Sequence, residues 1–237
     1  MLNKTKVLLV DDHTVVREGL SMLLGADPEF EIVGAAENGR QAVAAAQQTR
    51  PDVVLMDLAM PIMNGVTASR KILQEVKGTK ILVLSSYNDE PAIDELMQAG
   101  ASDYLLKESA AGELLNAIRQ VRKGGKAFSP AITRRFRHQQ QRDPNANQTA
   151  KRSCNLTPRE MEVLQLIAEG FPNKGIASEL GISIKTVEKH RQQVMDKLNI
   201  HDIAGLTRYA IERNIIDHPE QPFLENAGGG TRGPKAA

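Results

Sequence analysis

The segment DVVLMDLAMPIMNG, residues 52–65, joins an apolar run, a carboxylate and a turn. The four residues before Asp57 are continuously apolar, as in a strand that is buried on both faces of a parallel sheet. Pro61 cannot continue a central strand, and Asn64-Gly65 marks a turn before the next helix. Asp57 is therefore expected at the carboxyl end of a core strand, where ligands bind in open α/β sheets. Because aspartates at such positions also serve as turn formers, the rest of the sequence must decide its role.

Strand-like and helix-like patterns alternate five times in the first half of the chain. Apolar runs predict strands over residues 6–10, 31–34, 52–57, 80–85 and 102–106. Helices are predicted over residues 14–25, 39–48, 65–76, 90–98 and 110–123. This alternation is typical of a doubly wound α/β domain with helices on both faces of a parallel sheet. Since crossovers are right-handed, we expect a five-stranded parallel sheet in the flavodoxin-like order 2-1-3-4-5.

Polar residues stand at the ends of four of the expected strands: Asp11, Asp12, Asp57, Ser85 and Lys107. Carboxylates crowded at one sheet edge repel one another unless a cation joins them, and oxygen ligands suit a hard divalent cation. Each residue alone has an ordinary explanation, such as helix capping, a backbone contact or a solvated position. Their joint occurrence at strand ends favours a functional site. The neighbouring His13 is expected to be an ordinary surface histidine.

The same residues suit the transfer of a phosphoryl group, because that chemistry depends mostly on positioning and charge neutralisation. Asp57 is the candidate nucleophile and would form an aspartyl phosphate. Lys107 and the hydroxyl of Ser85 would supply a positive charge and a hydrogen-bond donor.

The pattern as a whole resembles the receiver domain of two-component response regulators. The positions that carry the resemblance are Asp11-Asp12, Asp57, Met60-Pro61, Asn64-Gly65, Ser85, Gly100-Ala101, Tyr104 and Lys107. The resemblance implies that a histidine kinase donates phosphate to Asp57. It also implies a Mg²⁺ cofactor held by Asp12, Asp57 and the backbone carbonyl of Ala59, with Asp11 acting mainly through water. Ser85 and Tyr104 would form the pair that reorients on phosphorylation.

Residues 153–217 have the pattern of a small all-α domain with four helices. Thr157, Pro158 and Glu160 form a capping-box signature that opens the first helix. Asn173 is expected to cap a short second helix, which ends at Leu180. A Gly-containing turn and a helix over 184–198 follow, and a last helix is expected over 203–214. A short helix, a tight turn and a longer helix make a helix-turn-helix.

The helix over 184–198 has an apolar stripe on one face and a polar stripe on the other. Lys185, Lys189 and Gln192 lie on the polar stripe, and Arg191 lies nearby. A recognition helix in the major groove requires this arrangement, with base contacts from Lys189 and Gln192 and backbone contacts from Lys185 and Arg191. A solvated amphipathic helix would show the same stripe. The charge of residues 153–217, eight basic against nine acidic residues, also weakens the case for DNA.

The segment from Leu156 to Leu198 nevertheless resembles the LuxR-type helix-turn-helix. Its motifs are Thr157-Pro158-Arg159-Glu160, Asn173-Lys174-Gly175-Ile176-Ala177, and Lys185-Thr186-Val187 with His190. The resemblance implies DNA binding by the third helix at Lys185, Thr186, Glu188, Lys189, Arg191 and Gln192. It also implies a dimer contact on the fourth helix at Leu206, Tyr209 and Ala210.

Composition sets the domain boundaries and excludes several classes of protein. We expect a receiver over 1–125, a linker over 126–152, the helix-turn-helix domain over 153–217 and a disordered tail over 218–237. The linker is polar, and residues 133–152 carry six basic residues against one acidic residue. The single cysteine excludes internal disulfides, and 3% aromatic residues argue against base-stacking platforms. Without a signal or membrane-spanning pattern, a cytoplasmic protein with no membrane partner is expected.

A receiver followed by a LuxR-type helix-turn-helix is the arrangement of the NarL/FixJ class of response regulators. The resemblance therefore implies a phosphorylation-controlled transcriptional regulator whose partners are a histidine kinase and double-stranded DNA. It also implies a homodimer when the protein is phosphorylated or bound to DNA. By analogy with other members of this class, we also state the hypothesis that the receiver covers the third helix before phosphorylation.

Two other functions stay open at this point. A phosphorylation-independent DNA-binding protein or interaction adaptor would use the receiver only as a dimerisation module. An aspartate-nucleophile phosphatase of the haloacid dehalogenase type would need a second aspartate two residues after the nucleophile. Ala59 stands at that position, so turnover of a substrate, and hence an enzyme, is not expected.

Overall fold

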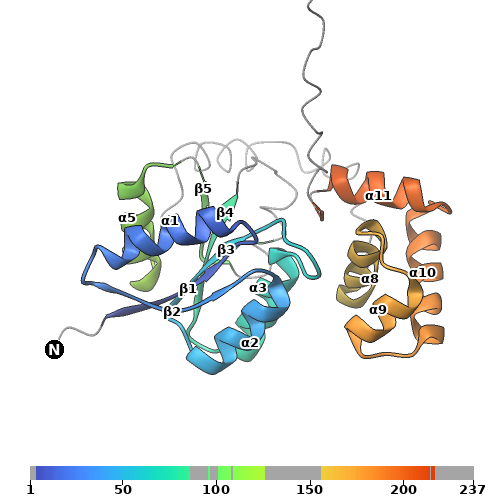
Figure 1. Cartoon of the computed structure of the whole chain (residues 1–237), viewed down its shortest axis with the longest axis horizontal. Helices are drawn as coiled ribbons and strands as arrows, with labels where there is room; N and C mark the ends of the chain where they lie inside the picture. Colours follow the sequence, from blue (N-terminus) through green and yellow to red (C-terminus); the bar gives the residue numbers. More distant parts are fainter. Residues whose placement is uncertain are drawn as a thin grey trace, which may run out of the picture.

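The computed structural model describes residues 4–85, 96, 101–107, 109–125, 156–213 and 215–216. Figure 1 shows an N-terminal sheet with its helices beside a C-terminal group of helices. The expected linker over 126–152 and tail over 218–237 lie outside the described residues. The expected helix over 90–98 also lies outside them, except for the buried Leu96.

The N-terminal sheet has the predicted parallel topology. Its strands are β1 (Thr5–Val10), β2 (Phe30–Ala36), β3 (Val53–Asp57), β4 (Lys80–Ser85) and β5 (Asp103–Leu106). They lie in the order β2-β1-β3-β4-β5, and every neighbouring pair is parallel. The prediction of a doubly wound five-stranded sheet is confirmed. β2 is longer than expected, because its pairing with β1 continues to Ala36.

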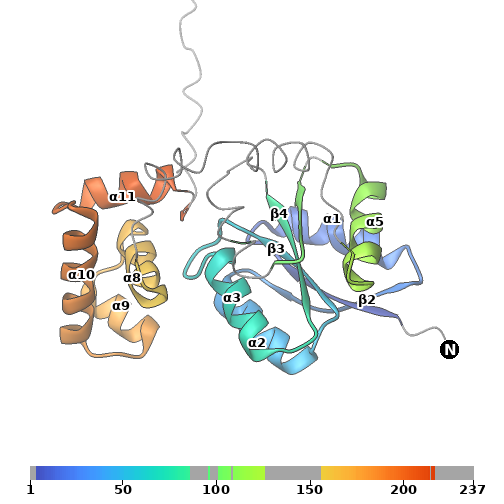
Figure 2. The same ribbon diagram turned by 180° about the vertical axis from the view of Figure 1, so that it is seen from behind.

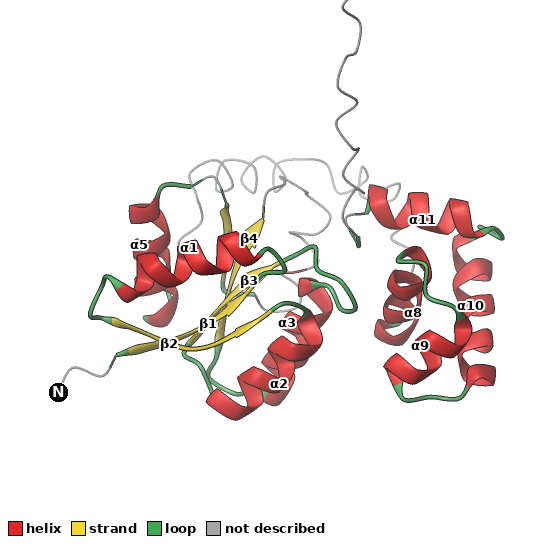
Figure 3. Ribbon diagram, viewed as in Figure 1, coloured by secondary structure: helices red, strands yellow, loops and turns green. Residues whose placement is uncertain are grey.

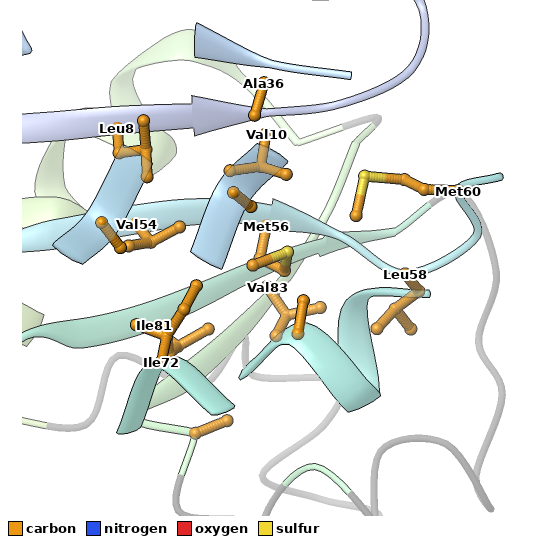
Figure 4. Packing of buried hydrophobic residues seen from close by; sticks show 14 of the residues in the cluster. Leu8, Val10, Ala36, Val54, Met56, Leu58, Met60, Ile72, Ile81 and Val83 are labelled. Carbon is orange, nitrogen blue, oxygen red and sulfur yellow. The ribbon is translucent and has the colours of Figure 1, made fainter. Parts of the chain in front are cut away.

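Helices cover both faces of this sheet, as Figures 1 and 2 show from opposite sides. One face packs against α1 (Thr14–Gly25) and α5 (Ala111–Arg122), and the other packs against α2 (Gly39–Thr49) and α3 (Gly65–Glu75). Alternate residues of each strand therefore enter different cores. Figure 4 shows Val54 and Met56 of β3 in the core on the α2 and α3 side, where Ile72 of α3 lies next to Ile81 of β4.

The turn between β3 and α3 is packed tightly against the end of β3. The amide of Gly65 donates to the carbonyl of Leu58 at 2.8 Å. The side chain of Asn64 caps α3 by accepting a hydrogen bond from the amide of Thr67 at 2.9 Å. A Cβ atom on Gly65 would lie 1.9 Å from the carbonyl oxygen of Asp57, so no larger residue fits there without moving the backbone. Gly65 therefore fixes how closely α3 approaches the candidate phosphoacceptor.

The C-terminal part consists of four described helices around their own core (Figure 3). They are α8 (Pro158–Ala168), α9 (Asn173–Leu180), α10 (Ile184–Leu198) and α11 (Ile203–Glu212). The predicted capping box is confirmed, because Thr157 and Glu160 bond each other's backbone amides. None of the described helices has the length and apolar character needed to cross a lipid bilayer.

The predicted N-cap of the second helix is wrong by one residue. Pro172 occupies the N-cap of α9 and offers no side-chain cap, whereas Asn173 is already helical. The Asn173 side chain instead accepts a hydrogen bond from the Arg191 guanidinium at 2.9 Å. An asparagine at this position therefore joins α9 to α10 instead of capping its own helix.

We predict that Gly65→Ala lowers the free energy of unfolding by about 2–4 kcal/mol, because its Cβ would collide with backbone that cannot move freely. Gly19→Ala is the matched control, since a Cβ at Gly19 in the middle of α1 meets no atom within 4 Å. That change should raise the free energy of unfolding by up to about 1 kcal/mol. Urea unfolding followed by circular dichroism measures both values. Equal stability of Gly65→Ala and wild type would contradict the account of this turn.

Candidate functional site

Asp57 and Asp11 lie side by side at the carboxyl edge of the sheet. β1 and β3 pair in parallel with Val10 opposite Met56, so the residues that follow these two positions are neighbours. Both aspartates are buried. The amide of Leu58 donates to Oδ1 of Asp57 at 2.8 Å, which fixes the orientation of that carboxylate. The structure thus brings together the carboxylates that the sequence places at two strand ends.

Lys107 bridges the two buried carboxylates. Its Nζ atom lies 2.6 Å from Oδ2 of Asp11 and 2.9 Å from Oδ2 of Asp57. The lysine follows β5, two strands away from β3 in the sheet, and its side chain is 15% exposed. It is therefore not a solvated surface lysine. The ion pairs compensate part of the cost of burying two carboxylates at one edge.

The site shifts the protonation of both partners. Burial, opposed by Lys107 and reinforced by Asp11, raises the pKa of Asp57 from 3.8 to about 7. Burial alone would lower the pKa of Lys107, but its contacts with Asp57 and Asp11 outweigh burial and raise that pKa. The lysine thus stays charged beside an aspartate whose ionisation is balanced near neutral pH.

The donor set at this edge fits a hard divalent cation. Asp11, Asp12, His13 and Asp57 each offer a ligand atom, and these atoms lie within 4.8 Å of one another. Oδ1 of Asp12 is buried, and the contact described for it is with Nδ1 of His13, at 2.8 Å. Three carboxylates suit Mg²⁺, which prefers oxygen ligands and retains several waters. Ala59, expected to add its backbone carbonyl, is also buried near the end of β3.

Two residues beside the carboxylates have contacts that the sequence did not predict. The amide of His13 donates to Oδ1 of Asp11 at 2.9 Å, and its Nδ1 atom lies 2.8 Å from Oδ1 of Asp12. Arg17 donates to the backbone carbonyl of Asp11 at 2.7 Å and pairs with Glu37. Because α1 begins directly after these aspartates, contacts from the residues at its start could have been expected from the sequence.

The structure describes the side chain of only one of the two expected switch residues. Tyr104 is buried in β5 and packs in the core on the α2 and α3 side. Ser85 ends β4, but its side chain lies outside what the structure describes. A reorienting pair formed by these two residues remains a prediction.

On α10, most residues of the expected DNA-reading stripe are exposed. They are Lys185, Glu188, Lys189 and Gln192. The opposite face of the helix buries Val187 and Val194 in the domain core. The two other expected contact residues are partly exposed: Thr186 bonds to the N-cap Ser183, and Arg191 bonds to Asn173. The structure thus presents a polar stripe to solvent and ties Arg191 to α9.

The expected dimer residues require a correction. Leu206 and Ala210 have no exposed surface, because both pack into the core that α11 shares with α8. They are therefore not available as direct contacts to a partner. Tyr209 is partly exposed, and its ring lies 5.5 Å from the Arg213 guanidinium. The apolar face that the sequence shows on this helix belongs to its own domain.

We predict that Mg²⁺ affinity rises with pH up to about 7 and then levels off. A metal ion would bind the ionised carboxylate, so below the pKa of Asp57 it would have to displace a proton. Mg²⁺ should therefore bind about tenfold more weakly at about pH 6 than at about pH 8. Calorimetric titration of Mg²⁺ into the protein measures this, and Asp57→Asn should remove most of the pH dependence. An affinity of the wild-type protein that is constant over this range would contradict the prediction.

Comparisons with known proteins give the same two-part division. Residues 7–119 match the response regulator receiver domain, and residues 154–210 match the luxR family of bacterial regulatory proteins. The transcriptional regulatory protein LiaR of Bacillus subtilis is 39% identical over 216 residues, covering 90% of this chain and 99% of its own. The oxygen regulatory protein NreC of Staphylococcus carnosus is 37% identical, with the same two coverages.

Solved structures support the same assignment. A structure of the Salmonella typhimurium RcsB response regulator, described as showing conformational dynamism for DNA interaction, aligns with a TM-score of 0.61 and 26% identity. The alignment covers 89% of this chain and 98% of the RcsB chain. A LuxR-family response regulator from Aurantimonas sp. SI85-9A1 aligns with a TM-score of 0.56 and 32% identity, over 59% of this chain and all of its own. The chain therefore belongs to the NarL/FixJ class of two-component response regulators, the transcriptional regulators that join a receiver domain to a LuxR-type DNA-binding domain.

Proposed function

We propose that Asp57 is the phosphoacceptor through which a histidine kinase controls DNA binding by this regulator. The observation that carries the proposal is the buried Asp57 carboxylate, bridged to Asp11 by Lys107 at the end of β3. Such a cluster holds a nucleophile, a fixed positive charge and spare oxygen ligands at one point. These are the parts that phosphoryl transfer needs.

In the proposed reaction, an ionised oxygen of Asp57 attacks the phosphorus atom of a phosphohistidine on the kinase. A P–O bond forms, the P–N bond breaks, and the imidazole of the kinase leaves. Lys107 holds its charge beside the new acyl phosphate, and the amide of Leu58 keeps the carboxylate oriented. Bound at Asp11, Asp12, Asp57 and the Ala59 carbonyl, Mg²⁺ would supply further charge neutralisation.

The C-terminal domain would bind double-stranded DNA through α10. Lys189 and Gln192 are exposed in the middle of the helix and are the proposed base-contacting residues. Ser183 caps the helix, so the positive end of its dipole and Lys185 suit contact with a phosphate. One solved relative is described as two RcsB dimers bound to two parallel DNAs. By analogy, we propose that this protein binds DNA as a homodimer.

A homodimer through α11 needs other residues in place of the buried Leu206 and Ala210. Ile203 is 54% exposed at the start of α11 and is the largest apolar side chain described as exposed on that helix. Arg208 is also exposed there. These side chains, with Tyr209, are the proposed dimer contacts. Their number is small, so we propose that DNA or phosphorylation is needed to make the dimer stable.

The proposal does not include an enzymatic activity on other substrates. Phosphatases with an aspartate nucleophile use a second acid two residues further on, and this chain has Ala59 there. The aspartyl phosphate would therefore act as a signal and not as an intermediate in turnover.

We predict that acetyl phosphate with Mg²⁺ adds one phosphoryl group to the wild-type protein and none to Asp57→Asn. Intact-mass spectrometry measures the added mass, and omission of Mg²⁺ should reduce it strongly. Asp52→Asn is the matched control, because Asp52 precedes β3 and accepts a hydrogen bond from the amide of Lys6 at the opposite end of the strand. It should be phosphorylated as wild type is. Phosphorylation of Asp57→Asn to the wild-type level would contradict the assignment of the phosphoacceptor.

A further inference from the structure

On α10, an exposed apolar side chain and an exposed carboxylate lie one helical turn apart. Ile184 is 45% exposed and is not among the residues that pack in the core of the C-terminal helices. Glu188 follows four residues later and is also exposed. Residues four positions apart lie on one face of a helix, about 6 Å apart along its axis. Ile184, Glu188 and Gln192 therefore form one row on the solvent side of α10.

The carboxylate of Glu188 has no hydrogen bond or ion pair with any residue that the structure describes. Two residues one turn further along α10 are engaged elsewhere. Arg191 donates to Asn173 at 2.9 Å, and Gln192 donates to Asp196 at 2.8 Å. Glu188 also lies beyond the first turn of α10, where a negative charge gains most from the helix dipole. No contact in the described part of the domain therefore accounts for this carboxylate.

The row lies on the part of α10 that is open to a ligand. Figures 1 and 2 show α10 at the outer edge of the helical domain, away from the receiver. The hypothesis that the receiver covers the third helix therefore does not describe this structure. In a helix-turn-helix, the N-terminal residues of the recognition helix contact base edges. Ile184 and Glu188 stand in that half of α10.

The chemistry of a carboxylate restricts what Glu188 can meet in the major groove. An ionised carboxylate only accepts hydrogen bonds, so phosphates and the acceptor edge of guanine repel it. Cytosine offers the amino group at N4 as a donor, whereas adenine offers an amino group beside an acceptor. The mixed edge of adenine suits an amide that both donates and accepts. Cytosine is therefore the base whose edge fits Glu188.

The neighbouring Ile184 suits a different group in the groove. The C5-methyl group of thymine is the apolar group that the major groove presents, and it favours contact with apolar side chains. The separation of about 6 Å along the helix corresponds to about two base-pair steps of about 3.4 Å. Ile184 and Glu188 can therefore contact bases that lie within about two base pairs of each other.

We propose that Glu188 and Ile184 set the base preference of this regulator. Glu188 accepts a hydrogen bond from N4 of a cytosine, and Ile184 contacts the methyl group of a thymine within about two base pairs of it. The inference rests on the proposed function, in which α10 enters the major groove. At a site without that cytosine, the carboxylate stays unpaired among acceptors and lowers the affinity. Glu188 thus acts largely by rejecting other sequences.

Selection from a library of DNA duplexes with a fully randomised core tests the assignment. The full chain is treated with acetyl phosphate and Mg²⁺. Wild type should select sites with an invariant cytosine and a nearby thymine. Glu188→Ala should lose the cytosine preference, and Glu188→Gln should exchange it for adenine, because an amide fits the adenine edge. Glu212→Ala is the matched control, since it removes an exposed glutamate from α11 in the same domain, and it should select the wild-type site.

Affinities for the selected duplex separate the reading of bases from the effect of charge. Replacing the cytosine–guanine pair should weaken binding by wild type about tenfold, and binding by Glu188→Ala less than about twofold. Replacing the thymine with deoxyuridine removes only the methyl group. That change should weaken binding by wild type about threefold and leave binding by Ile184→Ala unchanged.

The possible contrary results have different meanings. An unchanged cytosine preference in Glu188→Ala would overturn the assignment but leave DNA binding by α10 intact. Equal tightening of all duplexes in Glu188→Ala would also overturn it, because Glu188 would then only repel phosphate. An equal loss on deoxyuridine in Ile184→Ala would overturn the thymine contact. Wild type that selects no sequence, with Lys189→Ala binding DNA as wild type does, would contradict the proposed function itself.

Discussion

The burial of Asp11 and Asp57 beside Lys107 is the interaction on which this receiver depends. Two carboxylates in a poorly solvated position are costly, and a single lysine within 3 Å of both compensates part of that cost. The arrangement requires β1, β3 and β5 to end at one edge, which the parallel order of the sheet provides. The same arrangement leaves Asp57 with a pKa of about 7, so a metal ion or a phosphoryl group changes the charge balance of the whole edge.

The turn after β3 is the segment that lies directly beside this edge. It is short, it is held close to Asp57 by Gly65, and it contains a strained Ile62. Its backbone groups bind Gln165 of α8 and Glu169, the residue that caps the end of α8. The loop is therefore held on both sides, by Gly65 against the end of β3 and by the hydrogen bonds of Gln165 and Glu169.

Local patterns in the sequence were sufficient for the sheet and for the cluster of acids. Continuous apolar runs predict buried strands, and Asp57 stands where such a run stops. The same patterns could not show what covers an apolar face: Leu206 and Ala210 mark the buried side of α11, but only the structure shows that its own domain buries them. Gln165 gave no signal either, since it is a polar residue within an apolar helix face whose partners lie about a hundred positions away. Such contacts depend on how the two domains dock, so they produce no periodic pattern in the sequence.

The most direct test of phosphate-controlled DNA binding uses a genomic DNA fragment that the protein binds. The affinity of the protein for this fragment is measured at fixed salt, with and without acetyl phosphate and Mg²⁺. The account predicts that the phosphodonor tightens binding by wild type at least about tenfold and does not affect Asp57→Asn. Lys189→Ala should weaken DNA binding both with and without the phosphodonor. That result would assign the DNA contact to α10. Equal affinities of wild type and Asp57→Asn, with no response to the phosphodonor, would contradict the account and favour a DNA-binding protein that does not depend on phosphorylation.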